Sequence, residues 1–321
     1  MSKKKTAIIT GVNGQDGAYL SNLLYNKGYN VIGTVRSLNT NLSRLEYFNL
    51  LTKIKIVECN FLENNSINRL FDRFGNIDEF YNLAAISFVY SSFYQPQTTF
   101  NTNTVALINI LEIIRNKHKK VKLYQASTSE IYGNNKMNTM SEKSPKIPAS
   151  PYAISKLSSF HLIRMYREAY GIFCCNGILF NHESPLRGEL FVTKKITKSL
   201  ARYKLGLSRE TGIGNIYSKR DWGYAGDFVE GMYKIMQQKK PEDFVLATNT
   251  TYKIKDFIDI SLKYLKINFK WLGNNPSEMK CIDTKTNKII FKTNKNFYRP
   301  LDLTYLKGDY KKAKKVLKWV P

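Results

Sequence analysis

The stretch TAIITGVNGQDG, residues 6–17, decides the fold. Its first five residues predict a short buried strand, and the amphipathic stretch 19–27 predicts a helix that Gly28 ends. Gly11, Gly14 and Gly17 lie between the two with the spacing G-x-x-G-x-x-G. Such glycines let the backbone approach a diphosphate, and the helix N-terminus offers unpaired N–H groups to the phosphates. The stretch predicts a dinucleotide-binding turn, with a plain strand-to-helix turn as the alternative.

Strand and helix patterns alternate through the first half of the chain. The predicted strands are 30–35, 54–58, 79–83, 121–126 and 173–179, and the predicted helices are 65–74, 101–117 and 152–170. This alternation is typical of an α/β fold, a Rossmann-type doubly wound parallel sheet that binds ligands at the carboxyl ends of its strands. Further helical patterns follow at 192–204, 227–238 and 255–265. We expect a dinucleotide-binding Rossmann domain over 1–180 plus approximately 215–250. A smaller, discontinuous substrate-binding domain would cover approximately 181–214 and 251–321.

The end of the second predicted strand bears on the choice of cofactor. An NAD site usually carries a carboxylate there for the ribose hydroxyls, but the residues present are Thr34-Val35-Arg36-Ser37. Arg36 can form a charge-assisted fork with a 2′-phosphate, which favours NADP. The alternative is a solvated surface arginine in a basic protein.

Two clusters predict an active site. Tyr152 and Lys156 are four residues apart on one face of a predicted helix, so the ammonium can stabilise a phenolate that acts as a base. A spacing of this kind also occurs on ordinary helix faces. Thr128 and Glu130, however, come at the carboxyl end of the preceding strand, where a parallel sheet places its active site. A hydroxyl and a second acid/base group are therefore expected beside the tyrosine.

The glycine turn, the hydroxyl cluster and Y-x-x-x-K, in this order, together resemble the extended short-chain dehydrogenase/reductase family. Within it, the segments 10–17, 124–130, 176–185 and 220–223 are similar to the GDP-mannose 4,6-dehydratase family, and Asn181-His182-Glu183-Ser184-Pro185 is the most specific of them. The similarity extends from about Lys5 to Pro321. Glu130 supports it, because epimerases and reductases of the superfamily usually lack a carboxylate directly after the hydroxyl pair.

The resemblance implies an internal redox cycle that converts GDP-D-mannose to GDP-4-keto-6-deoxy-D-mannose and water, for deoxyhexose biosynthesis of the fucose or rhamnose type. Tyr152 would take the proton of the 4-hydroxyl, with Thr128 and Lys156 in support, while NADP accepts hydride from C4. Glu130 would then remove the C5 proton and assist loss of the C6 hydroxyl, before hydride returns to C6. The 4-ketone makes this elimination feasible because it stabilises the developing carbanion.

Further site residues are implied by the same resemblance. The cofactor-binding set is Gly11, Gly14, Gln15, Asp16, Gly17, Arg36, Asn60, Leu83, Tyr152 and Lys156. The substrate-binding set is Ser87, Asn181, Arg187, Lys195, Arg220 and Arg299. Arginine suits a diphosphate because its planar fork donates two parallel hydrogen bonds. For His182 we expect a core histidine in a specific turn rather than a proton-transfer role, and for Glu183 a role in ordering that loop.

Three positions depart from the family pattern. Phe88 stands where the family usually has histidine, which removes a hydrogen bond close to the ligands. Asn60 replaces a usual aspartate after the third strand, and Ser37 replaces a second arginine, which weakens the preference for NADP. The resemblance implies a homo-oligomer, either a dimer or a tetramer.

Composition excludes several classes. With 43% hydrophobic and 23% charged residues, 321 residues are long enough to bury a large core, so disorder is excluded. The four cysteines have no C-x-x-C spacing, which favours a reducing, cytoplasmic location. The three histidines show no metal-ligand pattern, so no metal is expected. We expect no signal peptide and no membrane span.

A net charge of +25 raises the question of a polyanion partner. The lysines are spread along the chain rather than clustered, so solvated surface charge is the simpler interpretation and nucleic acid is an unlikely partner. The alternatives to the dehydratase are another nucleotide-sugar 4,6-dehydratase, a 4-keto-sugar reductase on the same fold, or a non-catalytic basic nucleotide- or RNA-binding protein. A reductase would consume cofactor, whereas a dehydratase would regenerate it.

Overall fold

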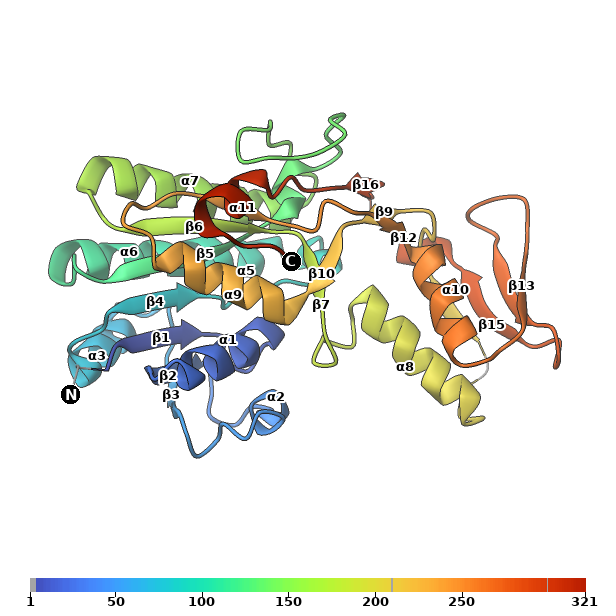
Figure 1. The fold of residues 1–321 in the computed structure, drawn as a ribbon, viewed down its shortest axis with the longest axis horizontal. Coiled ribbons are helices and arrows are strands. Elements are labelled where there is room, and N and C mark those ends of the chain that lie inside the picture. Colours follow the sequence, from blue (N-terminus) through green and yellow to red (C-terminus); the bar gives the residue numbers. More distant parts are fainter. Residues whose placement is uncertain (1–3, 209, 299) are drawn as a thin grey trace.

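The computed structural model describes residues 4–208, 210–298 and 300–321, and its centre is a parallel sheet of seven strands (Figure 1). The order across the sheet is β11-β6-β5-β4-β1-β2-β3. The strands are β1 (Thr6–Thr10), β2 (Asn30–Val35), β3 (Lys55–Glu58), β4 (Glu79–Asn82), β5 (Lys122–Thr128), β6 (Cys174–Leu179) and β11 (Phe244–Leu246). Every neighbouring pair runs parallel. The Rossmann-type α/β class is therefore confirmed.

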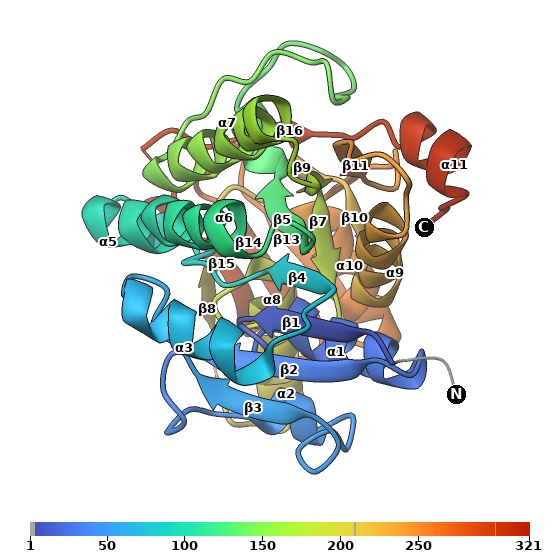
Figure 2. The same cartoon turned by 90° about the vertical axis from the view of Figure 1, so that its left-hand side faces the viewer.

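Helices cover both faces of this sheet (Figure 2). One face carries α1 (Gln15–Asn26), α9 (Ala225–Met236) and α11 (Lys311–Leu317), and the other carries α3 (Asn64–Phe74), α6 (Ala106–Lys117) and α7 (Pro151–Tyr170). Ile9 of β1 belongs to the core of the first face, and its neighbour Ile8 belongs to the core of the second. Successive strand residues point to opposite faces, so a strand buried on both faces needs an unbroken apolar run. The sequence of β1 supplies it.

The later part of the chain builds a second region at the carboxyl ends of the strands (Figure 1). Its sheet, β13-β14-β15-β8, packs with two helices around a core that includes Ile196, Ile258 and Phe291. The elements are α8 (Val192–Lys204), β8 (Thr211–Ile213), α10 (Ile254–Tyr264), β13 (Phe269–Leu272), β14 (Lys280–Asp283), β15 (Ile289–Thr293) and the 3-10 turn η3 (Lys295–Phe297). The division of the chain into the two predicted domains stays a prediction.

Two small sheets lie between these regions (Figure 1). β7 (Asn181–Glu183) pairs in parallel with β10 (Trp222–Tyr224), and β9 (Lys219–Arg220) pairs with β12 (Tyr252–Lys253) and β16 (Tyr305–Leu306). These short strands bring residues that are far apart in sequence to the carboxyl edge of the large sheet. None of the helices in the described part of the chain is both long and apolar enough to cross a bilayer.

Several predicted elements differ in extent. Helix α1 begins at Gln15, four residues before the predicted start, because the glycine turn leads directly into it. The predicted helix 101–117 opens with a π-helical turn, η1 (Asn101–Val105), preceded by α4 (Val89–Ser92) and α5 (Pro96–Phe100). Within η1 the side chains of Asn103 and Thr104 bond to the backbone at Ile86 and Ser155. These side-chain contacts are tertiary, so helix periodicity does not reveal them.

Candidate active site

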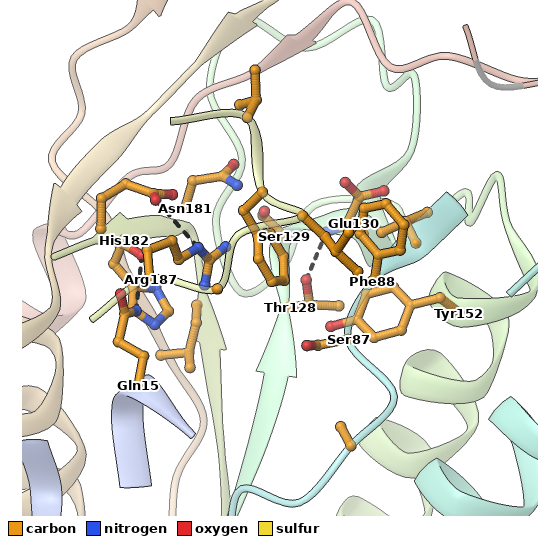
Figure 3. Close-up of a pocket in the computed structure, with 18 of the residues that line it drawn as sticks. Gln15, Ser87, Phe88, Thr128, Ser129, Glu130, Tyr152, Asn181, His182 and Arg187 are labelled. Atoms are coloured by element: carbon orange, nitrogen blue, oxygen red, sulfur yellow. Dashed lines mark hydrogen bonds and ion pairs between the residues drawn. The ribbon is translucent and has the colours of Figure 1, made fainter. Parts of the chain in front are cut away.

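A cavity of about 770 Å³ lies at the carboxyl ends of β1, β4, β5 and β6 (Figure 3). Its wall combines the glycine turn, the end of β5, the segment 179–192 and parts of the second region. Ligands of doubly wound sheets bind at this edge, where the loops after neighbouring strands diverge. The cavity therefore occupies the place that the alternating pattern predicted.

The glycine turn forms a close backbone cradle at one end of the cavity. Gly11 has φ +65°, a conformation that L side chains rarely adopt. A Cβ at position 17 would lie 2.4 Å from the carbonyl oxygen of Gly11. Gly14 is the N-cap of α1 and has no side chain to satisfy the first N–H groups of the helix. Those N–H groups suit the diphosphate of a dinucleotide.

The predicted base and its partners come together at the end of β5. Helix α7 begins directly beside the site because Ser150 accepts a hydrogen bond from the Ala153 backbone and Pro151 occupies the first turn. This places Tyr152 on the cavity wall, within hydrogen-bond reach of Thr128. One turn later, the buried Lys156 Nζ donates to the Ala126 carbonyl at 3.0 Å.

Burial dominates the acid–base properties of this pair. It raises the pKa of Tyr152 to about 12, against the lowering effect of the hydrogen bond to Thr128. It also lowers the pKa of Lys156 to about 8. Lys156 therefore still carries most of its positive charge at pH 7, and it is the cation nearest in sequence to the phenol on α7. In the protein without ligands, the phenol itself is neutral.

Glu130 lies on the same wall, two residues after Thr128. The chain turns there into the 3-10 helix η2 (Ser129–Tyr132), capped by Thr128, whose Oγ1 accepts from the Glu130 N–H at 3.3 Å. Figure 3 shows Thr128, Glu130 and Tyr152 facing one cavity, with the ring of Phe88 beside them. The structure thus brings a hydroxyl, a carboxylate, a phenol and, one turn along α7, an ammonium to one end of the cavity.

The predicted substrate residues line the opposite wall. Arg187 forms an ion pair with Glu183, with Nε 3.2 Å from Oε2, and its guanidinium lies 3.7 Å from the centre of the Phe191 ring. Lys195 of α8 lies over the ring of Phe297 at 3.6 Å. Asn181 and Arg220 also line the cavity, whereas Ser87 lies beside Thr128 and Tyr152 (Figure 3). Arg299 lies outside the described residues.

Arg220, predicted to bind substrate, also has a structural role. It is buried, and its two terminal nitrogens donate to the carbonyl oxygens of Lys219 at 3.0 Å and Leu303 at 2.8 Å. These bonds hold the guanidinium at the junction of the two regions. Arg220 also lines part of the cavity.

The remaining predicted cofactor residues divide into two groups. Leu83, Gln15 and Asp16 line the cavity, but Arg36 and Asn60 lie outside its wall. Arg36 is exposed at the end of β2, and the Asn60 amide donates to Glu63 Oε1 at 2.6 Å. Arg36 follows β2, the neighbour of β1, and Asn60 follows β3, the next strand of the sheet, so a ligand that extends beyond the cavity along this edge passes near them. Their roles stay predictions.

Two other residues of the site, Arg44 and Ser218, had no signal in the sequence. Arg44 of α2 (Ser43–Glu46) donates to the Asn13 carbonyl at 3.0 Å and to the Leu186 carbonyl at 2.8 Å, and so joins the glycine turn to the 181–191 segment. The hydroxyls of Ser127 and Ser218 are buried on the cavity wall, and neither has a hydrogen-bond partner within the described chain. Buried hydroxyls without a partner are rare, which points to partners supplied by a ligand.

The chain is similar over nearly its whole length to proteins of one known family. The family model for GDP-mannose 4,6 dehydratase matches residues 8–321. GDP-mannose 4,6 dehydratase of Dictyostelium discoideum is 39% identical over 334 residues, covering 99% of this chain and 91% of the relative. GDP-mannose 4,6 dehydratase 1 of Arabidopsis thaliana is 40% identical, and the alignment covers 99% of this chain and 86% of the relative. GDP-mannose 4,6-dehydratase of Vibrio cholerae is 38% identical, and the alignment covers 99% of this chain and 90% of the relative.

Solved structures share the fold at lower identity. dTDP-glucose 4,6-dehydratase from Bacillus anthracis in complex with NAD superposes with a TM-score of 0.79 at 18% identity, covering 99% of this chain and 91% of that one. UDP-glucuronic acid 4-epimerase from Bacillus cereus, with UDP-glucuronic acid and NAD, gives 0.81 at 22% identity, covering 98% and 94%. At these identities the likeness establishes the architecture, while the chemistry rests on the site.

Proposed function

The chain belongs to the GDP-mannose 4,6-dehydratase family, and from this premise we propose that it converts GDP-D-mannose to GDP-4-keto-6-deoxy-D-mannose and water. The observation that carries the proposal is the placement of Thr128, Glu130, Tyr152 and Lys156 together at the end of β5. Two acid/base groups beside one ligand are what oxidation followed by elimination requires. A reductase needs the tyrosine but has no use for the carboxylate.

The cofactor in this proposal is NADP, which supplies a hydride acceptor in the first step and a hydride donor in the last. The residues present fit a dinucleotide, because Gly11, Gly14 and Gly17 leave no Cβ in the cradle and α1 starts uncapped. Lys156 would hold the nicotinamide ribose. Arg36 would pair with the 2′-phosphate, and its position after β2 is the reason to prefer NADP to NAD.

Tyr152 acts as the base in the oxidation at C4. In its phenolate form, which the hydrogen bond from Thr128 stabilises, it receives the proton of the 4-hydroxyl and becomes a phenol. Because the pKa of Tyr152 is about 12 in the protein alone, the phenolate needs positive charge nearby: Arg187 lowers this pKa, and Lys156, one turn along α7, would add to that effect.

Glu130 acts in the elimination. The ketone at C4 acidifies the proton on C5; the carboxylate removes this proton and passes it to the C6 hydroxyl, which leaves as water. When hydride returns to C6, C5 takes up one proton, which balances the proton that Tyr152 received from the 4-hydroxyl. C4 has lost two electrons and C6 then gains two, so the sugar is rearranged with no net change in cofactor redox state. The side chains of Asn181, Arg187 and Lys195 would hold the sugar and the diphosphate during these steps.

We also propose a homo-oligomer in the cytoplasm. All four cysteines, at positions 59, 174, 175 and 281, are buried free thiols, which suits a reducing compartment. Light scattering on a size-exclusion column measures the oligomeric state, and a monomer at micromolar concentration would contradict the oligomer.

The test of the function is mass spectrometry of the protein incubated with GDP-mannose and a catalytic amount of NADP. We expect one water to be lost from GDP-mannose, with many turnovers per cofactor and no reduced cofactor accumulating. UDP-glucose and dTDP-glucose serve as controls. Loss of water from a control alone would overturn the substrate, and stoichiometric consumption of NADPH with a 4-keto sugar would indicate a reductase instead.

A further inference from the structure

His182 and Asp16 form a part-buried contact between two segments of the cavity wall. Nε2 of His182 lies 2.9 Å from Oδ2 of Asp16, which is in the first turn of α1. The imidazole is stacked on Phe228 of α9, with ring centres 4.5 Å apart and an angle of 19°. His182 is 7% exposed, so its ring is closed off from bulk water.

Four further hydrogen bonds, two of them from Arg44, fasten the same two segments together. The Gln15 amide donates to the His182 carbonyl at 3.1 Å, and the Ser184 hydroxyl donates to the Gln15 side-chain oxygen at 2.8 Å. Arg44 adds its bridge from the Asn13 carbonyl to the Leu186 carbonyl. The glycine turn, which would hold the cofactor, is thus tied to the segment that carries Asn181 and Arg187.

The hydrogen-bond partners of the ring favour its protonated form. Nδ1 lies 2.7 Å from the Phe180 carbonyl oxygen, which can only accept, so Nδ1 carries a proton. The Asp16 carboxylate accepts at Oδ2 from His182 and at Oδ1 from the Gln15 amide at 3.0 Å. With Asp16 ionised, Nε2 also donates, so this arrangement favours the imidazolium form of the ring.

The charges around the ring agree with this assignment. Burial disfavours the cation, but Asp16 outweighs it and the pKa of His182 lies above its usual value. For Asp16, burial is outweighed by the adjacent His182, and its pKa falls to about 2. The charged groups whose fields reach the ring are Asp16 from α1, Glu183 from β7 and Arg187, which follows β7 and pairs with Glu183. The other packed elements contribute uncharged groups, Phe228 from α9 and Gly223 from β10.

We propose that His182, held as a buried imidazolium by Asp16, is a positioning residue that fixes the substrate-side segment 181–187 to the cofactor-side glycine turn. Cofactor affinity and sugar-nucleotide affinity then both depend on this one ion pair. The ligands named in the proposal rest on the proposed function, but the ion pair and its protonation do not. His182 touches neither reacting carbon in this account, and it acts by holding Gln15, Asp16 and the segment in register.

The first experiment observes the ring directly. The chain has three histidines, so ¹⁵N-histidine labelling gives a simple NMR spectrum, which the variants His118→Gln and His161→Gln assign by loss of signals. We expect His182 to show two protonated ring nitrogens at pH 7, whereas burial lowers the pKa of both His118 and His161. Asp16→Asn should move the His182 titration to lower pH. A neutral His182 ring at pH 7 in the wild-type protein would overturn the proposal.

The second experiment measures ligand affinity. In His182→Gln we expect the Kd for NADPH, measured by its fluorescence, to rise roughly tenfold, equivalent to about 1.4 kcal/mol. The KM for GDP-mannose should rise by a similar factor, with a smaller change in kcat. For the wild-type protein, the Kd for NADPH should rise as the pH passes the His182 titration, and this dependence should vanish in Asp16→Asn.

The matched control is His161→Gln, at an exposed position on α7 that is outside the cavity wall. It should bind NADPH as the wild-type protein does. A folded His182→Gln that binds NADPH within twofold of wild type would refute the positioning role. If His182→Gln fails to fold, the wild-type NMR titration and the pH dependence of NADPH binding decide the matter. Absence of turnover on GDP-mannose, with these results as expected, would overturn the proposed function and leave the ion pair standing.

Discussion

Replacing Gly17 with alanine tests whether the glycine turn is a cofactor cradle. The new Cβ would lie 2.4 Å from the Gly11 carbonyl oxygen, 2.7 Å from Val12 Cα and 2.9 Å from the Val12 carbonyl carbon. All three are backbone atoms, so no side chain can rotate out of the way. Ordinary contact begins near 3.4 Å, which means that the turn and the start of α1 must separate by about 1 Å.

That displacement sets the size of the effect. A misplacement of about 1 Å in a preorganised site costs on the order of 100-fold, equivalent to about 2.7 kcal/mol of binding free energy. We therefore expect the Kd for NADP to rise roughly 100-fold in Gly17→Ala. The overpacked turn should also lower the free energy of unfolding by about 1–3 kcal/mol. Isothermal titration calorimetry measures the affinity, and urea unfolding measures the stability.

Gly206→Ala is the control for this prediction. Gly206 also has a left-handed backbone, with φ +72°, but a Cβ there would meet no atom of the described chain within 4 Å. It follows α8 and is not part of the cavity wall. We expect its variant to lose some stability and to bind NADP normally. A folded Gly17→Ala with a Kd within threefold of wild type, or an equal loss of affinity in Gly206→Ala, would refute the reasoning.

Three other predictions address the chemistry, the cofactor and pH. Glu130→Gln should retain NADP and GDP-mannose binding but eliminate water at least 100-fold more slowly by mass spectrometry, and near-normal dehydration would exclude Glu130 as the C5 base. Arg36→Ala should raise the Kd for NADP roughly tenfold and leave that for NAD unchanged, so an equal change in both would remove the 2′-phosphate contact. The ion pair of Asp16 and His182 should contribute about 2 kcal/mol of stability between pH 4 and 6.5. The pKa of Asp16 is lowered to about 2 and that of His182 is raised, so this contribution is lost as the pH falls below 4 and as it rises through the raised His182 pKa. Urea unfolding of the wild-type protein and of Asp16→Asn at several pH values measures the contribution. A difference in the free energy of unfolding that does not change with pH would contradict it.

Much of the fold could be predicted because it depends on local patterns. The strands β1, β2 and β6 are buried apolar runs, and α8 was predicted at its observed bounds, 192–204. The seventh strand, β11, has only three residues and escaped prediction, as did the four-stranded sheet of the second region. Strands this short have too little periodicity to be recognised, and they exist because a partner strand supplies their hydrogen bonds.

The candidate site was also predictable only in part. The glycine turn and the α7 pair were predicted because each depends on spacing within one element: G-x-x-G-x-x-G at the start of α1, and Y-x-x-x-K along one face of α7. Arg44 could not be predicted, since its role is to bridge two backbone carbonyls 173 residues apart in the chain, those of Asn13 and Leu186. His182 was expected to be a core histidine, and it is buried, but its ion pair with Asp16 was not expected.

The sequence by itself determined the class of sheet, the order of the motifs and the family, because each of these is written in residue types at fixed spacings along one chain. Only the tertiary structure decided the protonation of His182, the orphaned hydroxyls of Ser127 and Ser218, and the link between the glycine turn and the 181–187 segment. Charge states and unpaired polar atoms depend on burial and on neighbours brought together by the fold. No local pattern records those neighbours, so the electrostatics of the site emerge only when the chain has folded.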